Sequence, residues 1–119
     1  MAEETKLAEA TEEITFDYFT KVDIRVGKIV EAEPVPESKK LLKMQVDFGV
    51  EKRQCIAGLL KYYQPEELLG KKFVFILNLQ RRKLAGLESQ AMILAAEDET
   101  GTVSVLQPEK DVAEGSKIG

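Results

Sequence analysis

Alternation of apolar and polar positions marks much of the chain as β-structure. Residues 41–48 alternate most regularly, which is the pattern of a strand with one buried face. Residues 23–32 alternate around Gly27, where we expect a bulge or bend at which the sheet coils. After a turn at residues 49–51, residues 53–57 return as a third strand.

The second half of the chain contains two continuous apolar runs, residues 73–77 and 91–96. Their length and composition are typical of buried strands. The insert between them is polar and includes three consecutive cations, residues 81–83, followed by a glycine and a serine. A basic connection of this kind displays cations beside a β-surface, although the same cations also fit a solvated hairpin. A further short strand is predicted over 103–106, and residues 107–119 are predicted to form a loop-rich tail.

Two short helices are predicted. Thr15 is placed to cap the first, with Phe16 and Phe19 facing the core, and the second begins at Pro65 and ends at Gly70. The resulting order, with a bent first strand and a helix between strands 3 and 4, is that of an all-β fold. We therefore predict a five-stranded OB-fold Greek-key barrel with a C-terminal extension. A split β-sandwich fits the same periodicity.

Length and composition indicate one soluble globular domain. The chain has 119 residues, of which 44% are hydrophobic and 32% charged. We divide it into an acidic leader or linker, residues 1–13, and the OB-fold domain, residues 14–119. No apolar run is long enough to span a membrane, and the acidic N-terminus is unlike a signal peptide. The single cysteine, Cys55, is predicted to be a small buried hydrophobe and fits a reducing compartment, so we expect the cytoplasm.

The net charge of −4 is distributed unevenly along the chain. Residues 1–13 contain five Glu and one Lys. Residues 39–83 contain eleven Lys or Arg against four Asp or Glu, whereas the chain from Leu84 onward contains two Lys against seven acids. The chain after residue 13 is neutral as a whole, and its strongly basic middle third is a plausible footprint for nucleic acid, provided that folding brings these cations to one face.

Catalysis has little support in the sequence. Histidine, the commonest general base and metal ligand, is absent, and one cysteine without histidine makes neither an activated nucleophile nor a zinc site. No glycine-rich phosphate-binding motif occurs. We expect a non-catalytic protein with no cofactor and no metal.

Several motifs then carry a resemblance to a known family. The segments VDIRVGKI, KLLKMQVD, and NL followed by RKLAGLESQAM occur in the order found in the tRNA-binding domains attached to methionyl-tRNA synthetases. The similarity covers residues 14–118. The same domain occurs as a C-terminal domain or β subunit of these synthetases, as free dimeric tRNA-binding proteins, and in a eukaryotic multisynthetase cofactor.

The resemblance implies an OB-fold homodimer that binds tRNA by its shape and backbone rather than by its sequence. It also implies that the N-terminal helical segment and C-terminal strands form the dimer interface, and that a synthetase catalytic domain is a partner in cis or in trans. The residues that match the family's polar surface motif, with flanking cations, are Asn78, Lys83, Ser89 and Met92, with Lys40, Arg53 and Arg82. Cations of this kind neutralise phosphates, and the amide and hydroxyl groups can bond phosphate or ribose.

Two departures from the family pattern affect this site. The family usually has Lys-Pro after Asn-Leu, where this chain has Gln80-Arg81. It usually has Gly before the motif's Met, where this chain has Ala91, whose methyl group lies where backbone approaches a ligand. Both changes leave the contact geometry open.

Each candidate also has a purely structural interpretation. Asn78 could satisfy a backbone group at a strand end, Ser89 could be a turn residue, and Met92 could belong to the core. Arg25 could pair with an acid across the sheet. For Tyr62 and Tyr63, packing against the barrel's helix is favoured over stacking on bases. These alternatives are open at the level of sequence.

Three functional hypotheses remain. The first is a structure-specific tRNA-binding module, which the basic residues 81–83 favour. The second is a peptide-binding secretion chaperone of the same fold, which an exposed apolar groove would favour. The third is a domain that only dimerises.

Overall fold

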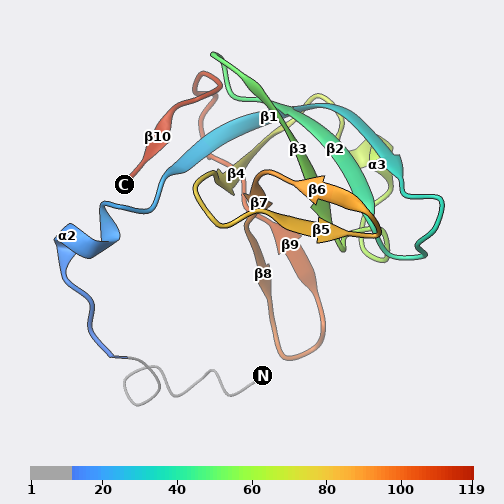
Figure 1. Cartoon of the computed structure of the whole chain (residues 1–119), viewed down its shortest axis with the longest axis horizontal. Coiled ribbons are helices and arrows are strands. Elements are labelled where there is room, and N and C mark those ends of the chain that lie inside the picture. The colour runs from blue at the N-terminus through green and yellow to red at the C-terminus, as the bar shows by residue number, and fades with distance from the viewer. Residues whose placement is uncertain (1–11) are drawn as a thin grey trace.

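The computed structural model describes residues 12–119, most of which lie in a small antiparallel barrel (Figure 1). Five strands are hydrogen-bonded in the order β3-β2-β1-β4-β7, with α3 between β3 and β4 in the chain. The predicted OB-like barrel is therefore confirmed. The bounds of these elements are β1 (Ile24–Pro34), β2 (Leu42–Asp47), β3 (Lys52–Ala57), α3 (Pro65–Leu68), β4 (Lys72–Ile76) and β7 (Met92–Ile93).

The interior of the barrel is formed by the apolar faces of these strands. In β2, Leu42, Met44 and Val46 are fully buried and alternate with partly exposed polar residues, as the periodicity predicts. Phe75 of β4 is fully buried and meets Phe48 edge-on, with ring centroids 5.4 Å apart. This edge-to-face contact between β4 and the residue that follows β2 is a favourable aromatic geometry in the core.

The register shift in β1 does not lie at Gly27, where the sequence suggested a bulge. The register between β1 and β2 shifts between Ile29 and Glu31, so the predicted bulge at Gly27 is wrong. Gly27 is instead a site of close packing. A Cβ built there lies 2.5 Å from both Val46 Cγ1 and Phe48 Cε1, so glycine leaves the space that Phe48 fills.

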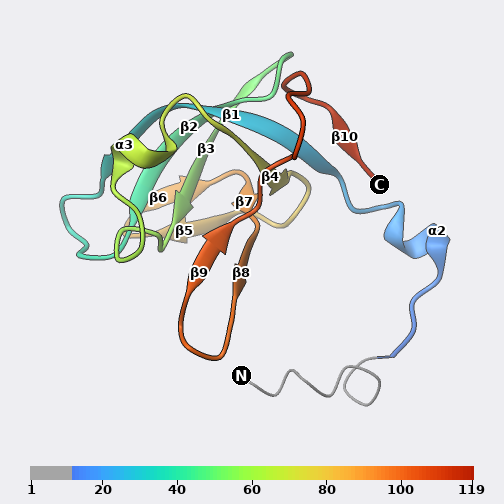
Figure 2. The same cartoon turned by 180° about the vertical axis from the view of Figure 1, so that it is seen from behind.

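The predicted fifth strand, residues 91–96, is divided at Leu94. Its first part, β7, pairs with β4, and its second part, β8 (Ala95–Glu97), pairs with β9 (Val103–Val105). Leu94 lies at the corner, where its N–H donates to Val74 O at 2.9 Å. The β8–β9 hairpin consequently projects out of the barrel in both views (Figures 1 and 2).

The polar insert is itself a hairpin rather than a loop. It contains β5 (Arg82–Leu84) and β6 (Leu87–Ser89), joined by a two-residue turn. Both turn residues, Ala85 and Gly86, have positive φ angles, of 51° and 81°. Turns of this class match the twist of the flanking strands, which explains the tight connection.

The C-terminal tail is more ordered than predicted. Its last strand, β10 (Lys117–Ile118), pairs with β1, opposite Ile24 and Arg25. Two residues of the tail before β10 bind Lys72 of β4. The Lys72 ammonium donates to an Asp111 carboxylate oxygen at 2.7 Å and to Val112 O at 2.8 Å. The tail is thereby fastened to β4 as well as to β1.

The N-terminal helix, α2 (Phe16–Phe19), is capped as predicted but does not face the core. Thr15 Oγ1 accepts a hydrogen bond from the Tyr18 N–H at 3.0 Å. Phe16 is 74% exposed and Phe19 only half-buried, so the predicted packing of Phe16 into the core is wrong. The helix stands apart from the barrel in both views (Figures 1 and 2).

The remaining structural predictions have mixed outcomes. Cys55 is fully buried, and burial raises the pKa of its thiol to about 12. Tyr63 packs against the core and its hydroxyl accepts from the Val105 N–H at 3.1 Å, whereas Tyr62 is exposed. Arg25 pairs with Asp23 at 2.8 Å, two residues before it rather than across the sheet.

The leader predicted over residues 1–13 lies outside the described residues, except for its last two positions. Within residues 12–119, no helix has both the length and the apolar character that a bilayer crossing requires.

Candidate nucleic-acid interface

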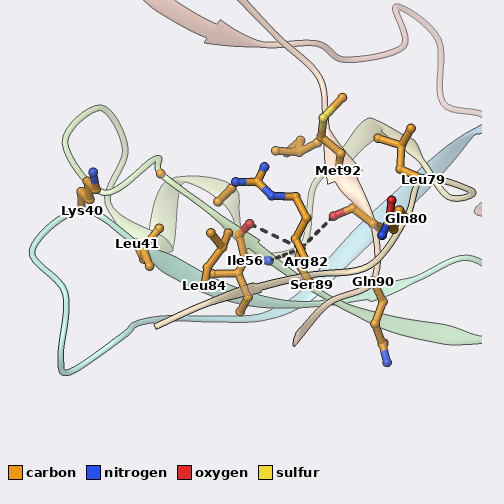
Figure 3. Close-up of a pocket in the computed structure, with 14 residues that line it drawn as sticks. Lys40, Leu41, Ile56, Leu79, Gln80, Arg82, Leu84, Ser89, Gln90 and Met92 are labelled. Atoms are coloured by element: carbon orange, nitrogen blue, oxygen red, sulfur yellow. Dashed lines mark hydrogen bonds between the residues drawn. The ribbon is translucent and has the colours of Figure 1, made fainter. Parts of the chain in front are cut away.

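A cavity of about 420 Å³ lies between the β5–β6 hairpin and the barrel (Figure 3). Its walls come from four places in the chain: the segment before β2, the end of β3, the hairpin with the residues preceding it, and β7 with the residues that lead into it. The lining residues are Lys40, Leu41, Ile56, Ala57, Gly58, Leu79, Gln80, Arg82, Leu84, Ser89, Gln90, Ala91, Met92 and Ile93. Four of the seven predicted site residues are therefore brought together here.

Strand alternation determines which hairpin cations face the cavity. Arg82 and Leu84 are two residues apart on β5 and both line it, and the Arg82 side chain reaches over the cavity in Figure 3. Lys83, between them, lies opposite Glu88 on the paired strand and is exposed. Since successive side chains on a strand point to opposite faces, Lys83 is displayed on the outer face of the hairpin, away from the other candidates.

Ser89 closes the barrel as well as lining the cavity. Its Oγ accepts a hydrogen bond from the Ile56 N–H at 3.0 Å and donates to Ala91 O at 3.0 Å. The neighbouring Gln90 continues the closure: Gln54 N–H donates to Gln90 Oε1 at 2.9 Å, and Gln90 N–H donates to Gln54 O at 2.7 Å. These bonds satisfy backbone groups on the outer edge of β3 and join the two ends of the sheet.

Arg53 is held by the protein itself. Its Nε donates to a Glu51 carboxylate oxygen at 2.6 Å, and its Nη1 donates to Leu77 O at 2.7 Å and to Gln90 O at 3.3 Å. Its side chain is only 21% exposed and does not line the cavity. The guanidinium links β3 to the end of β4 and to the base of the hairpin by hydrogen bonds, so Arg53 has a structural role.

Asn78 binds backbone groups near the end of a strand, which was the structural alternative to a role in RNA binding. Its Oδ1 accepts from the Asp23 N–H at 2.8 Å, and its Nδ2 donates to Lys21 O at 2.5 Å. The side chain therefore fixes the segment between α2 and β1 to the end of β4. It lies outside the set of residues around the cavity.

Lys40, Arg82 and Met92 are exposed at the cavity. Met92 is 40% exposed, so its alternative interpretation as a core residue is wrong. Within residues 12–119, no carboxylate forms an ion pair with Lys40 or Arg82. These two cations keep their positive charge available to a ligand at the mouth of an otherwise largely apolar hollow.

The apolar walls were not anticipated from the sequence. Leu79 and Leu84 flank the run of cations, and each contributes to the cavity. The sequence did contain a sign of these walls, since both leucines lie inside a polar insert. Leucines at a hairpin require an apolar surface to pack against. Of the three positions at which this chain departs from the family pattern, Gln80 and Ala91 also line the cavity, whereas Arg81 does not.

Comparison with known proteins places this geometry in context. Residues 24–117 match the family described as "Putative tRNA binding domain", which is more than three quarters of the chain. The chain belongs to this family. The match includes the barrel, the hairpin and every residue that lines the cavity.

Relatives within the family differ in how much of their length the domain represents. A methionine–tRNA ligase of Methanocaldococcus jannaschii is 54% identical over 116 residues, which are 98% of this chain and 18% of that protein. This chain thus spans less than a fifth of the ligase. A structure described as a MetRS-related protein from Pyrococcus horikoshii is 39% identical, with a TM-score of 0.87, and the alignment covers 92% of this chain and all of that one.

A chaperone has the same architecture. The structure of the chaperone CsaA from Bacillus anthracis is 31% identical, with a TM-score of 0.81, over 91% of this chain and all of that chain. The tRNA-binding domain family and the chaperone therefore share one barrel. The fold alone does not decide between an RNA and a peptide ligand.

Proposed function

We propose that this chain is a non-catalytic, structure-specific tRNA-binding module that acts with a methionyl-tRNA synthetase, in cis or in trans, in the cytoplasm. The observation that carries the proposal is that two exposed cations, Lys40 and Arg82, line the same cavity and form no ion pair with a carboxylate among residues 12–119. They come from distant parts of the sequence and meet on a face that belongs to a tRNA-binding domain. Two cations at one cavity suit the phosphates of a folded RNA.

The mode of binding that follows is independent of base sequence. Lys40 and Arg82 neutralise phosphates and release condensed counterions, which gives affinity without reading base identity. Arg81 and Lys83 are also exposed, but neither lines the cavity, so the proposal assigns the phosphate contacts at this site to Lys40 and Arg82. A domain of this kind raises the local concentration of tRNA at a catalytic domain carried elsewhere.

Dimerisation is the second part of the proposal. Ile14, Phe16 and Tyr18 expose 61%, 74% and 61% of their surface on or next to α2. Such a cluster of exposed apolar side chains is typical of a surface that associates with another protein. A second copy of this chain would cover it and would place two cation pairs on one assembly.

Binding of unfractionated tRNA, followed by fluorescence anisotropy across a range of salt concentrations, tests the proposal. We expect the Lys40→Glu/Arg82→Glu variant to bind at least tenfold more weakly and with a shallower salt dependence. The control is Lys110→Glu/Lys117→Glu, which reverses two charges in the C-terminal segment, away from the cavity. Absence of binding by the folded wild type at low salt contradicts the proposal, as does an equal loss in both variants.

The largely apolar wall of the cavity favours a second candidate, a peptide-binding chaperone. Leu79, Leu84 and Met92 supply the kind of surface that holds an apolar side chain. This candidate predicts that a leucine-rich peptide binds directly, and that tRNA has no effect on its binding. Competition between the two ligands measures which of them occupies the site.

A further inference from the structure

We propose that the cavity accepts a single unstacked nucleobase from the bound RNA, with the Arg82 guanidinium lying along the face of the base. This inference rests on the proposed function and deepens it. The domain would then hold one nucleotide of a single-stranded stretch in addition to neutralising the phosphate backbone. The apolar walls of the cavity would contact the base, a function that phosphate contacts alone do not give them.

The chemistry of the walls matches the faces of a base. Leu41 comes from the segment before β2, and Leu79 and Leu84 come from the hairpin and the residues that precede it; all three line the cavity together with Met92 (Figure 3). Unstacked bases expose flat π-faces that lose water favourably against apolar side chains and against guanidinium planes. A hollow of about 420 Å³ lies at the small end of the range for ligand pockets, which suits one ring system.

The charges suit a neutral ring attached to an anionic backbone. Among the described residues that line the cavity, two are cations and none is acidic. The Lys40 ammonium belongs to the segment before β2 and Arg82 to the hairpin, so a phosphodiester can approach between them while its base enters the hollow. Arg82 has two surfaces to offer, because a guanidinium stacks through its plane and donates through its edge.

The polar groups at the cavity are those that tolerate any base. The Gln80 side chain lines it, and within residues 12–119 its amide makes no hydrogen bond. An amide offers both donors and an acceptor, so it can pair with the edge of a purine or a pyrimidine. A pocket of this composition adds affinity for an unstacked base while leaving the binding independent of sequence.

An extended peptide fits this place less well. Extended peptides bind most readily by adding a strand to a free sheet edge. Here the edge of β3 is already used, since the Gln54 and Ile56 N–H groups donate to the Gln90 and Ser89 side chains. These two N–H groups are therefore not free to hold a peptide in register, and the two cations at the cavity disfavour basic segments.

Two oligonucleotides of equal length and charge test the proposal. One is a short RNA backbone in which every sugar is abasic except the central one, which carries the fluorescent base 2-aminopurine. The other is fully abasic. We expect wild-type protein to bind the base-containing oligomer roughly tenfold more tightly, in line with the measured effect of stacking one base on a protein side chain. We also expect the 2-aminopurine emission to change on binding.

Two variants report on the cavity itself. Gly58 lines it, and a Cβ added at this position would have no atom within 4 Å, so the site tolerates a side chain that fills the space. Gly58→Phe should abolish the preference for the base and weaken binding of whole tRNA several-fold with an unchanged salt slope, whereas Gly58→Ala should preserve both. Arg82→Lys keeps the charge and loses the stacking plane, so it should reduce the preference without reducing the salt slope.

Each contrary result has a definite meaning. Equal binding of the two oligomers by wild type, or unchanged tRNA affinity in Gly58→Phe, overturns the base site and leaves tRNA binding through Lys40 and Arg82 intact. Binding of a leucine-rich peptide that Gly58→Phe abolishes, with RNA binding unaffected, overturns it in favour of a peptide. Failure of wild type to bind whole tRNA at low salt overturns this inference and the proposed function together.

Discussion

The hydroxyl of Ser89 on β6 accepts a hydrogen bond, at 3.0 Å, from the buried backbone N–H of Ile56 on β3. A side chain thus supplies the acceptor that a backbone carbonyl supplies elsewhere in the sheet. The barrel is thus closed between β3 and the base of the hairpin by side chains as well as by backbone. Because Ser89 also lines the cavity, its structural and ligand-binding roles have to be separated by experiment.

Replacement of Ser89 by alanine separates them. The Ile56 N–H would lose its acceptor in a buried position, and an unsatisfied buried donor costs about 1–3 kcal/mol. We expect the free energy of unfolding in urea to fall by this amount in Ser89→Ala, with tRNA affinity nearly unchanged when the protein is folded. Ser104→Ala, at an exposed position on β9, is the control and should have little effect. Lost affinity with unchanged stability would instead make Ser89 a ligand contact.

Gly27 provides a test of packing in the barrel. A Cβ at this position would lie 2.5 Å from Val46 Cγ1 and from Phe48 Cε1, both in the core. Gly27→Ala therefore overpacks the interior and should lower the free energy of unfolding by about 1–3 kcal/mol. Gly58→Ala meets no such contact and should be neutral or slightly stabilising. Equal stabilities of the two variants, measured by urea unfolding, would show that Phe48 moves aside at no cost.

The ion pair between Lys72 and Asp111 predicts how the C-terminal tail responds to pH. The hydrogen bond from Lys72 lowers the pKa of Asp111 from its ordinary 3.8, and the same bond raises the pKa of Lys72 from its ordinary 10.5. A lowered carboxyl pKa stabilises the fold above pH 3.8 and ceases to do so as pH falls through the folded-state pKa. A raised ammonium pKa stabilises it below pH 10.5 and ceases to do so as pH rises through the folded-state pKa.

We therefore expect the tail to be best protected between these limits. Limited proteolysis of residues 107–119 at intermediate pH should be slower in wild type than in Asp111→Asn, and the two rates should converge in acid. The effect should be small and should diminish with salt, because the Asp111 carboxylate is largely solvent-accessible. Glu109→Gln, which removes a neighbouring charge that makes no ion pair within the described residues, is the matched control. Identical rates in wild type and Asp111→Asn would show that the other attachments of the tail, such as the Lys72 bond to Val112 O and the pairing of β10, are sufficient to retain it.

The exposed side chains of α2 predict the effect of a charge on self-association. Phe16→Asp places a carboxylate in the surface that we propose a second copy covers, and burying an unpaired charge is strongly unfavourable. Sedimentation should show a shift from dimer to monomer. Val50→Asp changes an apolar side chain that is 98% exposed in the β2–β3 turn, and it should leave association unchanged. A monomeric wild type, or a dimer that survives Phe16→Asp, would place the interface elsewhere or remove it.

Sequence patterns predicted those parts of the fold that depend on a regular face. The alternation in residues 41–48 was sufficient to predict β2 and its buried side, and Pro65 and Gly70 marked the ends of the α3 region. The corner at Leu94 and the pairing of β10 with β1 were missed. Each is decided by a partner far away in the chain, and a two-residue pairing leaves no periodicity to read.

The candidate site was only partly predictable for a different reason. Arg53 and Asn78 have the residue types that bind RNA, but protein carbonyls and N–H groups close to them in space compete for the same hydrogen bonds. Local sequence does not contain these partners. The exclusion of Lys83, in contrast, could have been derived: a two-residue turn at Ala85-Gly86 fixes the hairpin register, and alternation then separates Lys83 from Arg82.

The bonds at the base of the β5–β6 hairpin have a kinetic consequence. Ser89, Gln90 and the Arg53 guanidinium fasten this hairpin to the barrel, so it cannot swing outward without breaking the closure of the sheet. The hollow is consequently ready before a ligand arrives, and binding requires no slow opening step. Association should follow a single exponential whose rate rises linearly with ligand concentration and is accelerated by electrostatic steering at low ionic strength.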